Sequence, residues 1–201
     1  WTSREATSLT AVPRRLAVIG GGVVACEMSH AARGLGADEV TMLVRGTGLL
    51  ARMEPLAGEM VSAAFRDEGV DVRRGTSVTR VSRGDDGTVT LTLSDGGTLE
   101  ADEILVATGR HLNTDDVGLE SVGLEPGRPV SVDDSLRADG IDGAWLYAVG
   151  DVNGRNLLTH RGKYQARVCG DVIAARARRE SEDATGLRAT SDARGAPQVV
   201  F

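Results

Sequence analysis

Hydrophobic and polar positions follow two different periods along the first half of the chain. Three short apolar runs alternate with two segments that repeat apolar residues at helical spacing, in the order 15–20, 24–35, 39–44, 55–68 and 70–73. Continuous apolar runs of this length are typical of strands buried on both faces of a parallel sheet. Pro55 suits the first turn of a helix, and Gly36 and Gly69 suit helix ends. The pattern predicts three parallel strands joined by two helices.

A period of two residues replaces this pattern after residue 76. The segments 77–82, 88–93 and 98–101 alternate apolar and polar residues, and turns rich in Asp and Gly separate them. They predict an antiparallel β-meander. The run 103–108 is again continuously apolar and predicts one more buried strand.

The second half of the chain is less regular. Glycine, proline and acidic residues dominate 110–144, which predicts an irregular connection. An apolar strand is expected at 146–149 and a helix at 159–177, whereas 178–201 has the composition of a linker. The chain starts on Trp1 and ends on an apolar stretch that resembles the beginning of a strand, so we expect it to be a fragment.

Composition argues against several classes of function. The net charge of −6 over 201 residues and the isoelectric point near 5.1 argue against a nucleic-acid partner, which requires a basic surface. No apolar stretch reaches the roughly 18 to 20 residues of a membrane span, and no signal pattern opens the chain, so a cytoplasmic setting is expected. The two cysteines and three histidines lack metal-ligand spacing, so no metal site is predicted.

The segment VIGGGVVACE at 18–27 places three glycines between a predicted strand and a predicted helix. Gly20, Gly22 and Ala25 fit the dinucleotide fingerprint: glycine allows a tight turn and close approach of the pyrophosphate, and a small third residue lets the helix pack on the sheet. Unpaired N–H groups and the dipole at the helix N-terminus favour the phosphates. We therefore expect a Rossmann-like dinucleotide-binding domain, with Val23 also in the binding segment. An ordinary tight βα turn is the alternative.

The end of the second strand bears on which dinucleotide is bound. NAD-binding proteins place an acidic residue there to bind the ribose hydroxyls, whereas this chain has Val44 followed by Arg45. A guanidinium suits the 2′-phosphate of NADP, and Arg52 lies in the loop beyond. We favour NADP(H) over NAD(H). Alternatively, Arg45 is a solvated surface residue and the site accepts either cofactor.

Three motifs in register resemble the pyridine nucleotide-disulfide oxidoreductases, the family of glutathione reductase, dihydrolipoamide dehydrogenase and mercuric reductase. They are VIGGGVVACE, then ILVATGR at 104–110 with Asn113 and Thr114 close behind, and LYAVGD at 146–151. The resemblance implies an α/β fold with a three-layer NAD(P)-binding domain, which has a parallel sheet and a β-meander and is inserted into an FAD domain. In such flavoproteins hydride passes from NAD(P)H to the flavin, and then to a disulfide or another acceptor.

The resemblance also divides the chain into four parts. It implies a segment leading in from the FAD domain at 1–12, the NAD(P)-binding domain at 13–110, a connection and the C-terminal part of the FAD domain at 111–177, and a linker with the start of an interface domain at 178–201. The family's first glycine fingerprint and its redox-active cysteine pair would precede Trp1. The chain alone is therefore expected to lack turnover, and the full-length parent is expected to be a homodimer.

The resemblance assigns roles to individual residues. Glu27 would lie near the nicotinamide and the flavin and hold the ring at hydride-transfer geometry; alternatively, it stabilises the first helical turn. Gly109 would be a close-packed glycine facing the cofactor, with Arg110 beside it. The carboxylate of Asp151, which follows Gly150, would accept hydrogen bonds from the ribityl chain of the flavin.

Other chemistry-bearing residues allow two interpretations. His160 and Lys163 would lie where a helix approaches the flavin ring, although helix capping or a surface position explains them equally well. Cys26 lies near a helix N-terminus, which can lower a thiol pKa, but packing between helix and sheet is favoured. Neither Cys26 nor Cys169 has the spacing of the family's redox pair.

We predict that the chain is the NADP(H)-binding portion of an FAD-dependent oxidoreductase. The alternative is a stand-alone dinucleotide-binding or redox-sensing module without turnover. A short-chain dehydrogenase is rejected because that class needs a tyrosine followed by a lysine at helical spacing. Tyr147 has no such lysine, and Lys163 directly precedes Tyr164.

Overall fold

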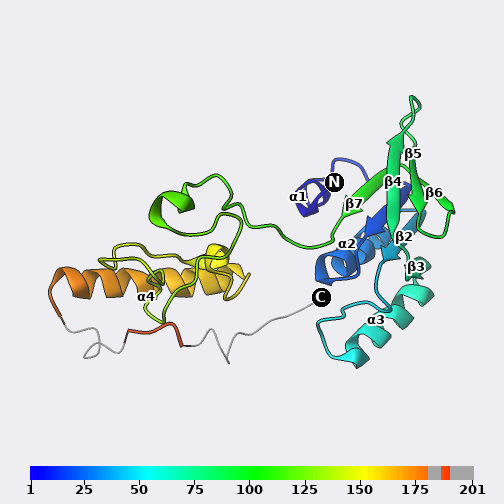
Figure 1. The fold of residues 1–201 in the computed structure, drawn as a ribbon. Helices are drawn as coiled ribbons and strands as arrows, with labels where there is room; N and C mark the ends of the chain where they lie inside the picture. Colours follow the sequence, from blue (N-terminus) through cyan, green and yellow to red (C-terminus); the bar gives the residue numbers. More distant parts are fainter. Residues whose placement is uncertain (181–186, 191–201) are drawn as a thin grey trace. The chain divides into compact units, whose positions relative to one another are not determined.

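The structure, a computed structural model, describes residues 1–180 and 187–190 of the chain. It divides into two compact units, of which the first runs from Trp1 to Gly109 and the second begins at Arg110 (Figure 1). Each unit has its own hydrophobic core. The strand start expected at 197–201 and most of the expected linker lie outside the described residues.

A parallel sheet of four strands forms the centre of the first unit, in the order β3-β2-β1-β7. The bounds are Arg15–Ile19 for β1, Glu39–Val44 for β2, Val70–Arg74 for β3 and Glu103–Val106 for β7. All residues of β2 after the first are buried, as expected for a strand that is covered on both faces. The sheet therefore accounts for the continuous apolar runs of the sequence.

Helices cover one face of this sheet (Figure 1). They are α2 (Val23–Gly34) and α3 (Pro55–Asp67), whose small and apolar side chains, with Phe65, pack against β1 and β2. Proline stands in the first turn of α3, as predicted. A short helix that was not predicted, α1 (Ser3–Ala6), is closed at its start by a capping box.

An antiparallel meander covers the opposite face. It consists of β4 (Val78–Arg83), β5 (Val89–Leu93) and β6 (Thr98–Ala101), paired in that order. The inward side chains of β5 pack against Ala17 and Leu43 of the parallel sheet. The first unit thus has three layers, namely helices, parallel sheet and meander, and the predicted fold class is confirmed.

The second unit has little regular structure before its long helix. η1 (Leu119–Val122) and η2 (Gly150–Asn153) are short 3-10 helices, and α4 has the predicted bounds, Thr159–Ala177. α4 packs on η2 and on the apolar residues around it. None of the helices in the described ranges is long and apolar enough to cross a membrane.

The strand predicted at 146–149 is wrong. A single bridge joins Tyr147 to Arg137 there. Leu136 adopts the left-handed conformation, with φ of 66°, and so ends the extended backbone that a longer ladder would need. Leu136 and Ala148 are nevertheless buried. The apolar run therefore marks the core of the second unit rather than a strand.

Candidate dinucleotide site

The glycine turn begins with a residue that no other amino acid can replace without strain. Gly20 follows β1 with φ of 134°, a conformation that side chains with a Cβ rarely adopt. A Cβ placed there would lie 2.4 Å from the carbonyl oxygen of Ala107. The Gly20 N–H donates to the carbonyl oxygen of Leu43 at 3.0 Å, so the turn is bonded to β2 as well.

The N-terminus of α2 is open. Gly22 is the N-cap, and no side chain caps the first N–H groups of the helix. A Cβ added at Gly22 would meet no described atom within 4 Å. Ala25 is fully buried, which lets the first turn of α2 pack closely on the sheet, and Val23 packs against the same core. The turn thus presents unpaired N–H groups at the carboxyl edge of the sheet.

The loop after β2 is fastened to this turn. The N–H of Leu50 donates to the carbonyl oxygen of Gly21 at 2.7 Å. Leu49 and Leu50 are buried, and Leu50 has φ of 51°. Gly58 of α3 approaches so closely that a Cβ there would lie 2.4 Å from the Leu49 carbonyl oxygen. This role of the two leucines was not predicted, although a pair of adjacent leucines in a polar, glycine-rich loop is a visible signal.

Arg45 and Arg52 lie on this fastened loop, and both are exposed. No hydrogen bond or ion pair joins either guanidinium to another residue in the described part of the chain. Both charges are therefore available to an anionic ligand, as their assignment to a 2′-phosphate requires.

Glu27 and Cys26 lie further along α2. The first turn of α2 contains no acidic residue, so the alternative role of Glu27 as a first-turn acid is wrong. Burial, and then the charge of Glu27, raise the pKa of the Cys26 thiol to about 11. Cys26 is only 4% exposed and belongs to the core. The packing interpretation of Cys26 is therefore confirmed, and the lowered pKa is not observed.

The second unit brings Arg110 and Asp151 together. Nη1 of Arg110 lies 3.4 Å from Oδ2 of Asp151 and donates to the carbonyl oxygen of Leu157 at 3.2 Å. Both side chains of the ion pair are more than half exposed, at 60% and 55%. The resemblance implies that Asp151 bonds to the flavin and that Arg110 lies beside Gly109 and the cofactor; the structure adds that Arg110 and Asp151 are neighbours.

A buried amide positions the turn that carries Asp151. Gln165 of α4 is fully buried, and its Oε1 accepts hydrogen bonds from the N–H of Gly150 at 2.7 Å and from Nδ2 of Asn153 at 2.8 Å. Gly150 has φ of 79° and lies so close to α4 that a Cβ on Gly162 would be 3.4 Å from its Cα. Gln165 was not among the residues predicted from the sequence.

The remaining predicted residues are found in open positions. Gly109 has φ of 143°, and a Cβ added there would meet no described atom within 4 Å. No described protein atom therefore packs against this position, and its predicted place facing the cofactor stays a prediction; the backbone conformation alone requires glycine. His160 and Lys163 are exposed near the start of α4.

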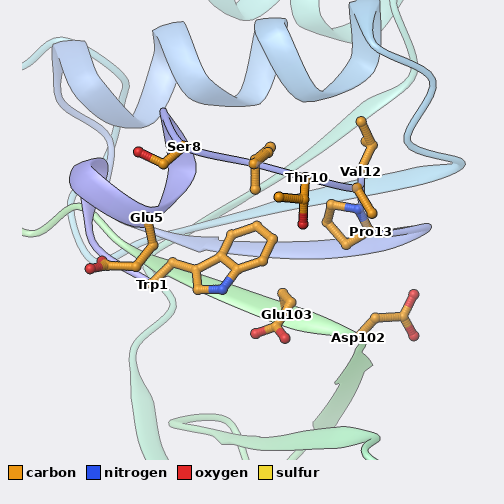
Figure 2. A pocket seen from close by; sticks show the side chains of 10 residues that line it. Trp1, Glu5, Ser8, Thr10, Val12, Pro13, Asp102 and Glu103 are labelled. Atoms are coloured by element: carbon orange, nitrogen blue, oxygen red, sulfur yellow. The ribbon is translucent and has the colours of Figure 1, made fainter.

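A cavity of about 500 Å³ lies elsewhere in the first unit, between α1, the segment after it and β7. Figure 2 shows the Trp1 indole inside it, between α1 and the strand that carries Glu103. The three carboxylates that line it each accept a hydrogen bond from a neighbouring side chain: Glu5, Asp102 and Glu103. None of its lining residues belongs to the glycine turn. We therefore do not assign the dinucleotide to this cavity.

The three layers and the glycine turn after β1 define an α/β protein with a Rossmann-like domain. Residues 1–172 match the family described as pyridine nucleotide-disulphide oxidoreductase. The chain belongs to this family. The resemblance drawn from the three sequence motifs is thereby confirmed.

Relatives and solved structures agree with this assignment. The mercuric reductase of Shigella flexneri is 38% identical over 206 residues, which cover 100% of this chain and 34% of the relative. The glutathione reductase of Burkholderia cepacia is 34% identical over 174 residues, 86% of this chain and 38% of the relative. The HOCl-induced flavoprotein disulfide reductase RclA of Escherichia coli is 25% identical, with a TM-score of 0.75 over 85% of this chain and 38% of its own. The chain thus spans only about a third of the length of these relatives.

Proposed function

We propose that the first unit binds NADP(H), and that the whole protein is an FAD-dependent oxidoreductase acting on a disulfide or another acceptor. The observation that carries the proposal is the uncapped N-terminus of α2 at Gly22, where a Cβ would meet no described atom within 4 Å. A pyrophosphate fits such a place because N–H groups and the helix dipole favour negative charge.

Each residue of the glycine turn would have a separate role in holding the pyrophosphate. Gly20 permits the close crossing with Ala107, Gly22 leaves room for the phosphates, and Ala25 lets α2 approach the sheet. The family membership of the chain supports this assignment, since the family is named for its pyridine nucleotide.

The preference for NADP(H) rests on charge. Arg45 follows the last residue of β2, where an acidic residue would favour NAD. Its guanidinium has no partner among the described residues, and the same holds for Arg52. A phosphate monoester is close to dianionic at neutral pH, so a guanidinium that is already paired would serve it less well.

The second unit carries residues that would hold the flavin. When bound, the two cofactors supply hydride transfer from the nicotinamide to the flavin. Asp151 would accept hydrogen bonds from the ribityl hydroxyls, since its carboxylate is half exposed on a turn that Gln165 holds in place. Glu27 would face the nicotinamide end of the turn, and its half-buried carboxylate has no hydrogen-bond partner among the described side chains.

The test is calorimetric titration of the 201-residue chain with NADPH and with NADH. NADPH should bind at least about tenfold more tightly, which corresponds to about 1.4 kcal/mol. Arg45→Ala should remove most of this difference without changing the affinity for NADH, because the change removes a charge that only the 2′-phosphate meets.

Two results would contradict the proposal in different ways. Equal binding of both nucleotides by the unaltered chain would remove the preference for NADP(H) and leave dinucleotide binding intact. Absence of binding by either nucleotide, in a chain shown by circular dichroism to be folded, would remove the assignment of the glycine turn itself.

A further inference from the structure

We propose that Arg74, at the end of β3, is a further specificity-determining residue that selects the 2′-phosphate of NADP(H). The inference rests on the proposed function of the glycine turn. It identifies a residue from a different strand than the one that carries Arg45, and the sequence pattern gave no reason to consider it.

The register of the sheet places Arg74 beside Val44, the residue directly before Arg45. Val44 and Arg74 are Cα partners in the parallel pairing of β2 and β3. Beyond this pair the two chains stay bonded, because Thr76 donates to the carbonyl oxygen of Val44 at 3.1 Å and Gly75 donates to that of Gly46 at 3.0 Å. Arg45 thus lies between Val44 and Gly46, whose carbonyl oxygens both accept hydrogen bonds from the segment directly after Arg74.

The alternation of side chains places Arg74 on the face of the sheet that carries the glycine turn and its helix. Partner residues in parallel strands share a face, and Val44 is part of the core beneath the helices. Leu49 and Leu50, which fasten the loop with Arg52, belong to the same core. Arg74 therefore lies on the side of the sheet that carries this core, at its carboxyl edge.

Arg73 provides a contrast one residue earlier. It pairs with Leu43, whose side chain faces the meander, so it lies on the opposite face. Its Nε donates to Oδ2 of Asp71 at 2.8 Å. Arg74 is exposed, and no hydrogen bond or ion pair joins its side chain to another residue of the part that the structure describes. Of these two adjacent arginines, only Arg74 combines an unpaired charge with the face of the glycine turn.

The chemistry of the ligand suits several guanidinium groups. A phosphate monoester carries a charge of about −1.5 to −2 at neutral pH and has three acceptor oxygens. One guanidinium presents a planar fork that meets two of them. A second guanidinium from the neighbouring strand would meet the remaining acceptor and charge. The ligand that Arg74 recognises is therefore the 2′-phosphate and not the part that NADH and NADPH share.

The experiment compares Arg74→Ala with Arg73→Ala as a matched control, together with Arg45→Ala, in titrations of the full chain with NADPH and NADH. Arg74→Ala should weaken NADPH about tenfold, in line with loss of one charged hydrogen bond, and leave NADH within about twofold. Arg73→Ala should leave both affinities within about twofold, since its charge is engaged by Asp71. Thermal melts of each variant control for folding.

Each other outcome has a distinct meaning. If Arg45→Ala weakens NADPH but Arg74→Ala behaves like Arg73→Ala, the role of Arg74 is overturned and the proposed function stands. If Arg74→Ala weakens NADPH and NADH equally, Arg74 does not select the 2′-phosphate. If the unaltered chain binds neither nucleotide, the proposed function fails, and the role of Arg74 fails with it.

Discussion

Leu50 donates its backbone N–H to the carbonyl oxygen of Gly21 across 2.7 Å, and thereby joins the loop after β2 to the glycine turn after β1. Leu50 holds this position in the left-handed conformation, with φ of 51°, which costs a residue with a Cβ roughly 1 to 2 kcal/mol. Burial of its side chain offsets that cost. The bond fixes the loop that carries Arg45 and Arg52 relative to the glycine turn, where the phosphates are predicted to bind.

Gly58→Ala tests how tightly this loop is held. The added methyl group would lie 2.4 Å from the Leu49 carbonyl oxygen. Overpacking against backbone costs about 1 to 3 kcal/mol, and only part is recovered from the better helix propensity of alanine, about 1 kcal/mol. We expect a lower urea midpoint of unfolding and weaker NADPH binding. Gly48→Ala is the control, because a Cβ there meets no described atom within 4 Å; equal effects of the two changes would contradict the argument.

The two glycines of the turn should separate folding from binding. Gly20→Ala places a Cβ 2.4 Å from the Ala107 carbonyl oxygen at φ of 134°, and we expect a loss of about 2 to 4 kcal/mol of unfolding free energy. Gly22→Ala meets no described atom within 4 Å, so its stability loss should be about 1 kcal/mol or less. The methyl group at residue 22 should nevertheless weaken NADPH more than about tenfold. Unchanged NADPH affinity in Gly22→Ala would show that the phosphates do not approach there.

The elements that were predicted well are those whose type and bounds depend on the local pattern of hydrophobic residues alone. The continuous apolar runs became β1, β2, β3 and β7, and the bounds of α4 agree with the prediction. The strand expected at 146–149 failed because its pairing depends on the conformation of Leu136, which apolar periodicity does not report.

The site was predicted in part for the same reason. Gly20, Gly22 and Ala25 form a contiguous motif whose chemistry follows from the turn itself. The contacts of Gln165 with Gly150 and the alignment of Arg74 with Val44 depend on tertiary register. The spacing of neighbouring residues in the sequence does not determine the register between distant elements, so a motif search could not have found these residues.

Cys26 should be an unreactive thiol. Its pKa is raised to about 11 by burial and by the charge of Glu27, and a raised thiol pKa means that the neutral form persists until the pH approaches that value. At pH 8 the thiolate fraction is then about two hundredfold below that of a free cysteine, whose pKa is about 8.5. Alkylation by iodoacetamide, located by peptide mass spectrometry, should accelerate only towards alkaline pH. Rapid labelling at pH 7 in the folded chain would contradict the burial argument.

Asp102 should make the first unit sensitive to acid. Its carboxylate accepts from Nη2 of Arg15 at 2.8 Å and from the backbone N–H of Arg15 at 2.9 Å, and these bonds lower its pKa. A lowered pKa contributes stability that is complete above the ordinary value, about 3.9 for aspartate, and is lost as the pH falls through the lowered value. Asp102→Asn should therefore lower the urea midpoint at pH 7, and the difference should shrink as the pH falls from the ordinary aspartate value through the lowered pKa of Asp102. A difference that is constant with pH would contradict the assignment.

Gln165→Leu should loosen the turn that carries Asp151 while leaving the first unit intact. The change removes the acceptor of the Gly150 N–H and of Asn153 Nδ2, both of which bond to Oε1 in a fully buried position. Leaving a buried donor without a partner costs about 1 to 3 kcal/mol, so the second unit should lose at least about 2 kcal/mol. Amide hydrogen exchange at Gly150 should accelerate about thirtyfold, whereas exchange in β1 and β2 should not change. Arg167→Gln, an exposed change on the same helix, serves as the control, and equal exchange rates at Gly150 in both variants would show that Gln165 does not hold the turn.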